Sequence, residues 1–211
     1  MASPHSQCSS FLADQPVTGV VMAGGLSSRM GQDKTQLSLN KAEYADLLGR
    51  TARILQEVVG AVCIVGREHP DYPSFFDDEP GLGPVGGIAT CLRRTGTACL
   101  VLSCDLPFMT AQVVRRLLEL RNQSPAETLV TCYVQQETGY SEPLVAVYEP
   151  GALPYFQECA NKRLLKINRI VPEDRQQFIY YGMPESLPFF NVNYPADLEA
   201  ARRILMAGGE G

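Results

Sequence analysis

Three short runs of almost uninterrupted apolar residues constrain the fold of this chain most strongly. They cover 17–23, 61–65 and 97–103. Runs of this length that are apolar at successive positions are typical of strands buried on both faces, as in parallel sheets covered by helices. We therefore predict an α/β fold of three layers, α/β/α, around a mostly parallel, Rossmann-like sheet.

Helical and turn patterns separate these runs. Apolar residues recur at helical spacing over 44–59, a Gly/Pro loop over 77–87 precedes a short helix through Ile88, and 110–121 is amphipathic with Thr110 as its N-cap. Further expected elements are strands at 128–134, 143–148 and 189–193, two helices within 151–170, and a last helix opened by Pro195. This order implies right-handed crossovers, with ligands beyond the carboxyl ends of the strands.

The length of 211 residues fits one globular domain. Residues 1–16 are polar and lack periodicity, so we expect a loosely ordered tail followed by a single domain over 17–211. The seven cysteines lack C-x-x-C spacing and there are only two histidines, which predicts neither a disulfide framework nor a zinc site. We expect most of the cysteines in the core, in a reducing compartment.

The net charge of -5 argues against general binding to nucleic acid or to an anionic membrane, since both require a basic surface. No apolar stretch reaches the length of a membrane span, and the first sixteen residues lack the pattern of a secretory signal. We therefore expect a cytoplasmic protein that binds any anionic ligand at a local site rather than on a generally basic surface.

The strongest local signal is the segment VVMAGGLSSRMGQDKTQL, at 20–37, which follows the first apolar run. Gly24 and Gly25 can adopt conformations closed to other residues, so that successive backbone N–H groups form a concave anion site. Arg29 and Lys34 add positive charge beside it. The segment lacks the Walker A pattern, and it suits a triphosphate. The alternative is a surface turn with incidental charges.

A second signal is the segment VLSCDLPF, at 101–108, where an apolar strand delivers Asp105 to the carboxyl edge of the sheet. Proteins bind Mg²⁺ through one or two carboxylates together with substrate phosphates, so one carboxylate suffices. An Asp at this position can instead cap a turn. The residues alone leave both interpretations open.

The loop AGGLSSRMGQDK, at 23–34, resembles the signature of the molybdenum cofactor guanylyltransferases, A-G-G-x-S-x-R-M-G-x-D-K, at every fixed position. The segment around Asp105 similarly resembles the Cys-Asp-x-Pro block of that family, in which the Asp holds the metal. The resemblance implies a nucleotidyltransferase fold and Mg²⁺ as the cofactor. It implies nucleotide contacts from Met22, Ala23, Gly24, Gly25, Ser27, Arg29, Lys34, Asp77, Asp78 and Asp105.

Two further segments resemble blocks of this family. DDEPGLGPVGG, at 77–87, resembles Asp…Gly-Pro-Leu-x-Gly, where Asp77 or Asp78 can accept hydrogen bonds from the N1–H and 2-amino groups of guanine. The sequence does not choose between these two residues, and a solvated acidic turn is the alternative. The second segment, FFNVNYPADL at 189–198, resembles the closing Asn-x-Asn-Thr-Pro-x-Asp-Leu block, with Tyr194 in place of threonine.

The acceptor side depends mainly on this resemblance. Asn191 and Asn193, two apart on the expected strand, point the same way and can bind a metal-bound water, a phosphate or the acceptor, or simply satisfy backbone groups. The resemblance also assigns Glu142-Pro143 and the segment 161–165 to the acceptor site. In that segment Lys162 and Arg163 supply positive charge, although adjacent basic residues on a helix also occur on solvated faces.

The predicted function is transfer of GMP from GTP to the phosphate of molybdopterin, or of its molybdenum form, with release of pyrophosphate. Lys34, Arg29 and Asp105 are the predicted catalytic residues, and Asp105 the metal ligand. Transient contact with proteins that mature molybdoenzymes is a further expectation. The alternatives are a cytidylyltransferase or sugar-nucleotide enzyme of the same fold, and a module that binds GTP or pterin without catalysis.

Overall fold

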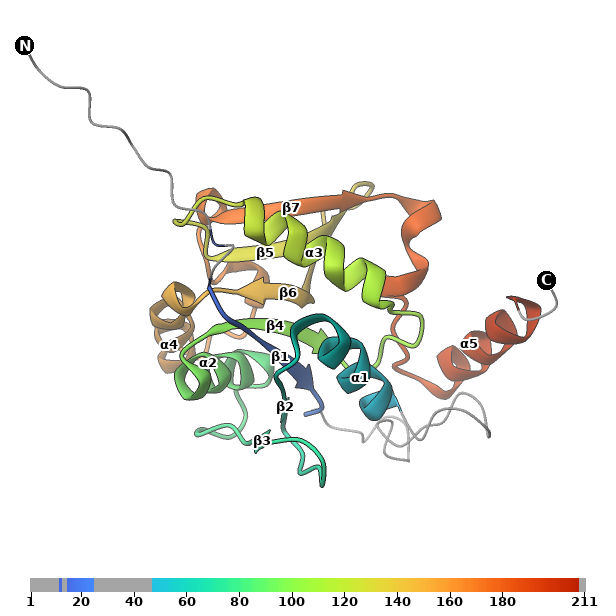
Figure 1. Ribbon diagram of the computed structural model, residues 1–211, viewed down its shortest axis with the longest axis horizontal. Coiled ribbons are helices and arrows are strands. Elements are labelled where there is room, and N and C mark those ends of the chain that lie inside the picture. Colours follow the sequence, from blue (N-terminus) through green and yellow to red (C-terminus); the bar gives the residue numbers. More distant parts are fainter. Residues whose placement is uncertain (1–11, 13–14, 25–46, 209–211) are drawn as a thin grey trace, which may run out of the picture.

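The computed structural model describes Leu12, 15–24 and 47–208 (Figure 1). The strands are β1 (Val17–Met22), β2 (Val62–Val65), β3 (Ser74–Phe75), β4 (Ala98–Ser103), β5 (Val130–Gln135), β6 (Ser141–Tyr148) and β7 (Gln176–Tyr181). The α-helices are α1 (Leu47–Val59), α2 (Pro84–Thr95), α3 (Ala111–Gln123), α4 (Leu153–Asn161) and α5 (Pro195–Gly208). Short 3-10 helices are η4 (Pro150–Ala152), η5 (Ile167–Arg169), η6 (Glu173–Arg175), η7 (Met183–Glu185) and η8 (Leu187–Phe189).

All the strands join one sheet in the order β3-β2-β1-β4-β6-β5-β7. Strands β3, β2, β1 and β4 are parallel to their neighbours, as are β5 and β7, whereas β6 runs antiparallel to both β4 and β5. The predicted mostly parallel sheet is therefore confirmed. The carboxyl ends of β1, β2, β4, β5 and β7 all lie at one edge, which we call the carboxyl edge, and β6 begins there.

Helices cover both faces of the sheet, which gives the predicted three layers (Figure 1). Side chains alternate along the central strands: Val21 and Leu100 pack toward α1 and α3, whereas Val20 and Val101 pack toward α2 and α4. Each of these four side chains is fully buried. Burial on both faces explains why the strands lack polar alternation in the sequence.

Helix α5 lies apart from these layers, beyond the carboxyl edge (Figure 1). Leu198 and Ala201 of α5 are buried together with Leu47 at the start of α1 and with Val192. As predicted, Pro195 opens this helix at its first position, where a missing N–H costs nothing.

Several boundaries differ from the predictions. Strand β7, with the sequence QQFIYY, was not predicted. Helix α2 begins at Pro84, inside the predicted loop, because proline fits the first helical turn. Only one α-helix, α4, forms within 151–170, and the second predicted helix there is replaced by the single 3-10 turn η5.

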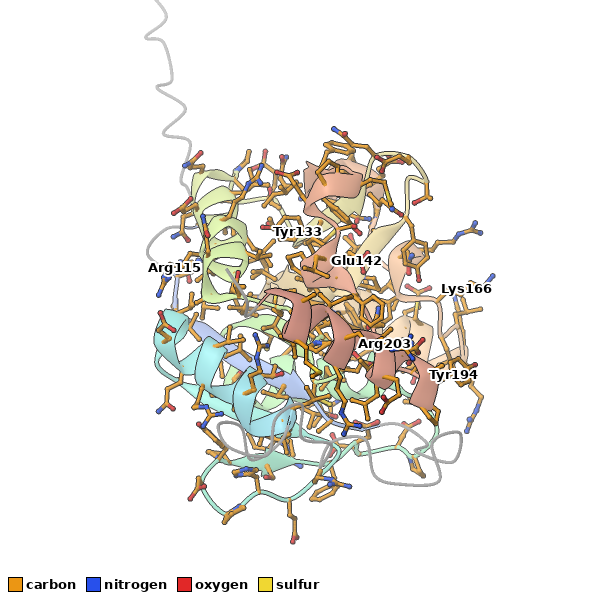
Figure 2. The ribbon with its side chains drawn as sticks, turned by 90° about the vertical axis from the view of Figure 1, so that its right-hand side faces the viewer. Arg115, Tyr133, Glu142, Lys166, Tyr194 and Arg203 are labelled. Atoms are coloured by element: carbon orange, nitrogen blue, oxygen red, sulfur yellow. The ribbon has the colours of Figure 1, made fainter. Side chains whose placement is uncertain are left out.

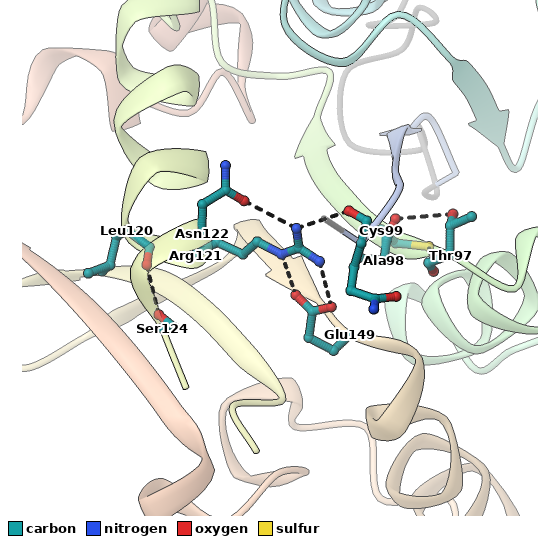
Figure 3. A network of polar contacts seen from close by, with 9 residues as sticks. Thr97, Ala98, Cys99, Leu120, Arg121, Asn122, Ser124 and Glu149 are labelled. Carbon is teal, nitrogen blue, oxygen red and sulfur yellow. Dashed lines mark hydrogen bonds and ion pairs between the residues drawn. The ribbon is translucent and has the colours of Figure 1, made fainter. Parts of the chain in front are cut away.

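A buried ion pair joins α3 to the end of β6 (Figure 3). Arg121 Nε donates to Glu149 Oε1 at 2.7 Å and Nη2 donates to Oε2 at 3.0 Å, and the two side chains are 1% and 6% exposed. Arg121 Nη1 also donates to the backbone oxygen of Gln15 at 3.1 Å. This bidentate pair satisfies two buried charges and attaches the chain before β1 to the domain.

The cysteines within the described residues form no disulfide, and five of the six are buried, as predicted for core residues. Sγ of Cys63 and Sγ of Cys91 lie 3.9 Å apart between β2 and α2. Over 15–24 and 47–208, no helix is both long enough and apolar enough to span a bilayer.

Candidate functional site

The site begins where β1 ends at the carboxyl edge. The backbone amide of Ala23 donates to the oxygen of Val65 at 2.9 Å, so β1 and β2 remain together to their last residues. Beyond them, Gly24 meets Gly66, whose φ of +89° favours glycine. A Cβ at Gly66 would lie 2.5 Å from Gly24 Cα, so only glycine permits this approach.

Met22, Ala23 and Gly24 therefore lie at the carboxyl edge, where the sequence predicted nucleotide contacts. The other predicted loop residues lie outside the described part of the chain: Gly25, Ser27, Arg29 and Lys34. Gly66 was not among the predicted site residues. Its signal in the sequence was a glycine directly after the second apolar run, matching the glycines after the first.

Asp105 follows β4 at the same edge and is partly buried. Its carboxylate Oδ1 accepts a hydrogen bond of 2.6 Å from Oγ of Ser103, the last residue of β4. Next to it, the Arg50 guanidinium of α1 donates to the backbone oxygen of Met109 at 2.6 Å. Ser103 and Arg50 thus hold the loop after β4 in place through these hydrogen bonds. The orientation of the Asp105 carboxylate is fixed as a result.

The segment with the two predicted asparagines meets this loop directly. The backbone amide of Val192 donates to the oxygen of Asp105 at 2.9 Å. Val192 is buried, whereas Asn191 and Asn193 on either side are exposed. The backbone bond of Val192 therefore places the segment of both asparagines beside the loop of Asp105.

The predicted strand at 189–193 is wrong. Residues 187–189 form η8, and 190–193 carry no strand pairing. The apolar pattern of this segment reflects packing rather than a ladder, because Phe189 stacks on Tyr181 with ring centroids 4.1 Å apart. Tyr194 does not disturb the start of α5, since Asp197 Oδ2 accepts from the backbone amides of Asn193 and Tyr194.

The structure distinguishes Asp77 from Asp78. Asp78 is exposed and forms ion pairs with Arg94 and Arg93 of α2, and the hydrogen bond from Arg94 contributes most to lowering the pKa of its carboxyl. Asp77 is half-buried against the first turn of α2, where a Cβ at Gly86 would lie 3.0 Å from its Oδ2. Burial, reinforced by the charge of Asp78, raises the pKa of Asp77. Of these two residues, Asp77 is the one whose carboxylate packs into the edge.

Glu142, near the start of β6, adds a half-buried carboxylate at this edge (Figure 2). Tyr181 Oη donates to Glu142 Oε1 at 2.6 Å. Burial raises the pKa of Glu142, and the hydrogen bond from Tyr181 opposes that shift. Leu102 pairs with Val145, so the start of β6 lies beside the end of β4 at this edge.

Lys162 and Arg163 lie directly after α4. Lys162 is exposed and forms an ion pair with Glu158 one turn earlier. Arg163 adopts a φ of +51°, which is uncommon for a residue with a side chain. Asn161, which precedes them, lines a cavity of about 290 Å³ together with Asp78. The end of α4 therefore lies beside the loop of Asp78.

A metal at this edge would find few ligands among the residues that the structure describes. The described residues contain no cluster of three or more His, Cys, Asp or Glu side chains suited to a metal ion. Asp105 offers hard carboxylate oxygen, the donor type that Mg²⁺ prefers when phosphates supply other ligands. The donor set present therefore fits Mg²⁺ better than Zn²⁺.

Comparisons with known proteins identify the family of this chain. A family profile described as the MobA-like NTP transferase domain matches residues 19–176. The probable molybdenum cofactor guanylyltransferase of Pelotomaculum thermopropionicum is 32% identical, over 88% of this chain and 91% of that protein. The molybdenum cofactor guanylyltransferase of Xanthomonas euvesicatoria is 36% identical, over 81% of this chain and 92% of that protein.

Solved structures show the same fold. The molybdopterin-guanine dinucleotide biosynthesis protein A of Archaeoglobus fulgidus superposes with a TM-score of 0.71 at 24% identity, covering 90% of this chain and 99% of that one. A 2-C-methyl-D-erythritol 4-phosphate cytidylyltransferase of Thermus thermophilus superposes with a TM-score of 0.62 at 16% identity, covering 89% and 98%. The resemblance noted in the glycine-rich loop is thereby confirmed, and this chain belongs to the MobA-like NTP transferase family.

Proposed function

We propose that this chain transfers GMP from GTP to the phosphate of molybdopterin, forming the guanine dinucleotide and releasing pyrophosphate. The relatives named as molybdenum cofactor guanylyltransferases support this substrate pair. The structural observation that carries the proposal is the hydrogen bond between Val192 and Asp105. It joins the proposed metal carboxylate to the two exposed asparagines at the edge where the glycine-rich loop departs.

In the proposed reaction, an oxygen of the acceptor phosphate attacks the α-phosphorus of GTP. The new P–O bond forms as the bond to the β-phosphate bridging oxygen breaks, and pyrophosphate leaves with that electron pair. The chain supplies positioning and charge rather than a covalent nucleophile. We assign Arg29 and the loop N–H groups to the β- and γ-phosphates, and Lys34 to the α-phosphate as charge develops.

Asp105 would hold Mg²⁺, and Asn191 and Asn193 would orient the acceptor phosphate or a water beside it. A bound Mg²⁺ neutralises charge on the triphosphate. Ser103 keeps the Asp105 carboxylate in one orientation, and Arg50 keeps its loop against α1. These residues thus preorganise the edge before substrates bind.

We assign guanine recognition to Asp77 rather than Asp78. A carboxylate accepts hydrogen bonds from both the N1–H and the 2-amino group of guanine, and cytosine lacks that donor pair. Asp78 already neutralises two arginines in solvent. Asp77, partly withdrawn from water beside Gly86, would form stronger hydrogen bonds with the base.

The first test measures thermal stabilisation by GTP, CTP, ATP and UTP, each with Mg²⁺. We expect the largest shift in Tm with GTP, because selective binding stabilises the folded state by mass action. A larger shift with CTP or UTP would instead support a cytidylyltransferase or sugar-nucleotide enzyme. Pyrophosphate release is then measured with GTP and molybdopterin together, and no release would support a binding module without catalysis.

Lys34→Ala tests the mechanism within this function. We expect turnover at saturating substrate to fall by roughly 100-fold or more, with a smaller change in GTP affinity, because the lysine acts mainly in the transition state. Lys166→Ala, at an exposed lysine, is the matched control and should leave both quantities near wild type. The proposed role of Lys34 is wrong if its removal weakens GTP binding while turnover at saturation is unchanged.

A further inference from the structure

A groove of about 670 Å³ lies over the last strands of the sheet, and none of its lining residues is among the residues assigned above. Its floor is the face of β7 that carries Phe178 and Tyr180, and its walls are the β5–β6 hairpin and the segment with η5 and η6. The side chains that give it chemical character are Tyr140, Ser141, Asn168, Arg169, Glu173 and Tyr180.

The groove reaches the carboxyl edge. Strands β5 and β7 are parallel to each other and point the same way as β4, because β6 between β4 and β5 is antiparallel to both. Ser141 is the first residue of β6, Tyr180 is next to last in β7, and both line the groove. Three strand spacings, on the order of 14 Å, separate β4 from β7. A ligand that reaches from the groove to Asp105 must span a distance of this order.

Two aromatic rings make the groove suited to a flat ligand. Tyr140 and Tyr180 are 58% and 54% exposed, although tyrosine rings usually bury most of their surface. Phe178 lies edge-on to Tyr180, with ring centroids 6.3 Å apart, and supports that ring on the strand. Exposed aromatic faces in a hollow favour stacking with a planar heterocycle.

Charged groups of both signs line the same hollow. Arg169 and Glu173 are exposed, and neither side chain forms an ion pair or hydrogen bond with another residue of the described chain. A pterin ring carries an N3–H and a 2-amino group that can donate hydrogen bonds to a carboxylate. It also carries ring acceptors to which a guanidinium or an amide can donate. The groove therefore offers a carboxylate acceptor and a guanidinium donor beside two aromatic faces.

We propose that this groove seats the pterin ring of the acceptor, stacked on Tyr180 and Tyr140, while the acceptor phosphate lies at the carboxyl edge near Asp105. The inference rests on the proposed function and adds to it the location of the ring. It places the ring over β7 and the β5–β6 hairpin rather than beside Lys162 and Arg163 at the end of α4.

The test uses two substitutions at one position of the full chain. Tyr180→Val removes the ring but keeps a residue that favours strands, and Tyr180→Phe keeps the ring. Binding of 6-hydroxymethylpterin is measured by equilibrium dialysis with fluorescence detection, and the KM for molybdopterin is measured by pyrophosphate release at saturating GTP. Met206→Ala, at a 74% exposed residue of α5, is the control for an exposed apolar change.

For Tyr180→Val we expect the pterin Kd and the molybdopterin KM each to rise roughly tenfold, as loss of one stacking partner implies. The stabilisation by GTP should stay unchanged, and Tyr180→Phe and Met206→Ala should stay within about twofold of wild type. If Tyr180→Val does not fold, Tyr140→Ser in the hairpin replaces it with the same expectation.

The proposal is overturned if the wild-type chain does not bind 6-hydroxymethylpterin at millimolar concentration, or if loss of the ring leaves both constants unchanged. Failure of the proposed function has a different signature. In that case GTP and molybdopterin give no pyrophosphate, while pterin binding still depends on the ring at position 180 and so supports the groove.

Discussion

The backbone amide of Val192 donates a 2.9 Å hydrogen bond to the carbonyl oxygen of Asp105. This bond involves no side chain, so substitution of either neighbouring asparagine leaves it in place. The charge of Asp105 can likewise be removed without disturbing this junction. The edge can therefore be tested one functional group at a time.

Removing the charge of Asp105 should abolish activity without unfolding the chain. Asp105→Asn keeps an oxygen that can accept from Ser103 but removes the negative charge proposed for Mg²⁺. We expect turnover to fall by roughly 100-fold or more, since it removes electrostatic stabilisation of the transferring group. Pyrophosphate release over a Mg²⁺ titration measures this, with Asp174→Asn on the surface as the control. Wild-type turnover in Asp105→Asn would contradict the assignment.

The ionised carboxylate of Asp77 should lower the free energy of unfolding of the ligand-free protein at neutral pH. Because burial raises the pKa of Asp77 above its ordinary value of 3.8, the folded state binds this proton more tightly than the unfolded state. The resulting stability is present below pH 3.8 and is lost as the pH rises through the folded pKa. Asp77→Asn should therefore raise the free energy of unfolding at pH 7, a gain that shrinks toward pH 3.8.

The same substitution should weaken GTP binding by roughly 10- to 100-fold, since it removes a charged acceptor from the base. Asp78→Asn is the matched control. The pKa of Asp78 is lowered by Arg94 and Arg93, so the sign reverses, and its stability contribution is lost as the pH falls. Urea unfolding at several pH values and GTP titration measure both effects. Guanine selectivity lost in Asp78→Asn but kept in Asp77→Asn would reverse the assignment.

Gly66→Ala should damage the site as well as the fold. A methyl group there would lie 2.5 Å from Gly24 Cα, and Gly24 leads into the glycine-rich loop. Gly60→Ala is the control, because Gly60 has a similar positive φ of +79° with nothing within 4 Å of the added carbon. We expect Gly60→Ala to cost about 1–2 kcal/mol of stability with GTP affinity unchanged.

Gly66→Ala should cost clearly more and should also reduce the GTP-induced shift in Tm. Denaturant unfolding and thermal shift on both variants separate the strain of the backbone from the displacement of Gly24. Equal losses in the two variants, with unchanged GTP binding, would show that the close approach has no role in the site.

The buried pair of Arg121 and Glu149 should dominate the effects of charge removal on stability. Arg121→Met leaves the Glu149 carboxylate buried without its bidentate partner, and we expect a loss of about 3–5 kcal/mol. Arg115→Met, which breaks an exposed pair with Glu57, should cost less than about 1 kcal/mol. Urea unfolding compares them. Similar losses in both variants would contradict the structural role of the buried pair.

The sequence predicts the elements whose environment is uniform. Strands β1, β2 and β4 are buried on both faces, so their composition alone identifies them. Asp105 was placed correctly because the carboxyl end of a buried strand defines an edge. Thr110 was correctly predicted as an N-cap, and its Oγ1 accepts from the amide of Val113.

The elements that the sequence did not predict depend on contacts distant along the chain. Strand β7 lies at the edge of the sheet with Ile179 and Tyr181 buried and Tyr180 exposed, and β5 is its only pairing partner in the described sheet. The segment 189–193 carries a strand-like apolar pattern because it packs against Tyr181 and Asp105, not because it pairs. The choice between Asp77 and Asp78 required the arginines of α2, fifteen or more positions away.

The reversal of β6 divides the sheet into two blocks of uniform direction, β3-β2-β1-β4 and β5-β7. Among the described strands only β6 begins at the carboxyl edge, so the β5–β6 turn and the loop after β4 lie at the same edge of the sheet but belong to different blocks. A change of length in that turn alters one side of the edge without shifting the register of β1 against β4. The parallel block β3-β2-β1-β4 and the turn after β5 can therefore change independently of each other.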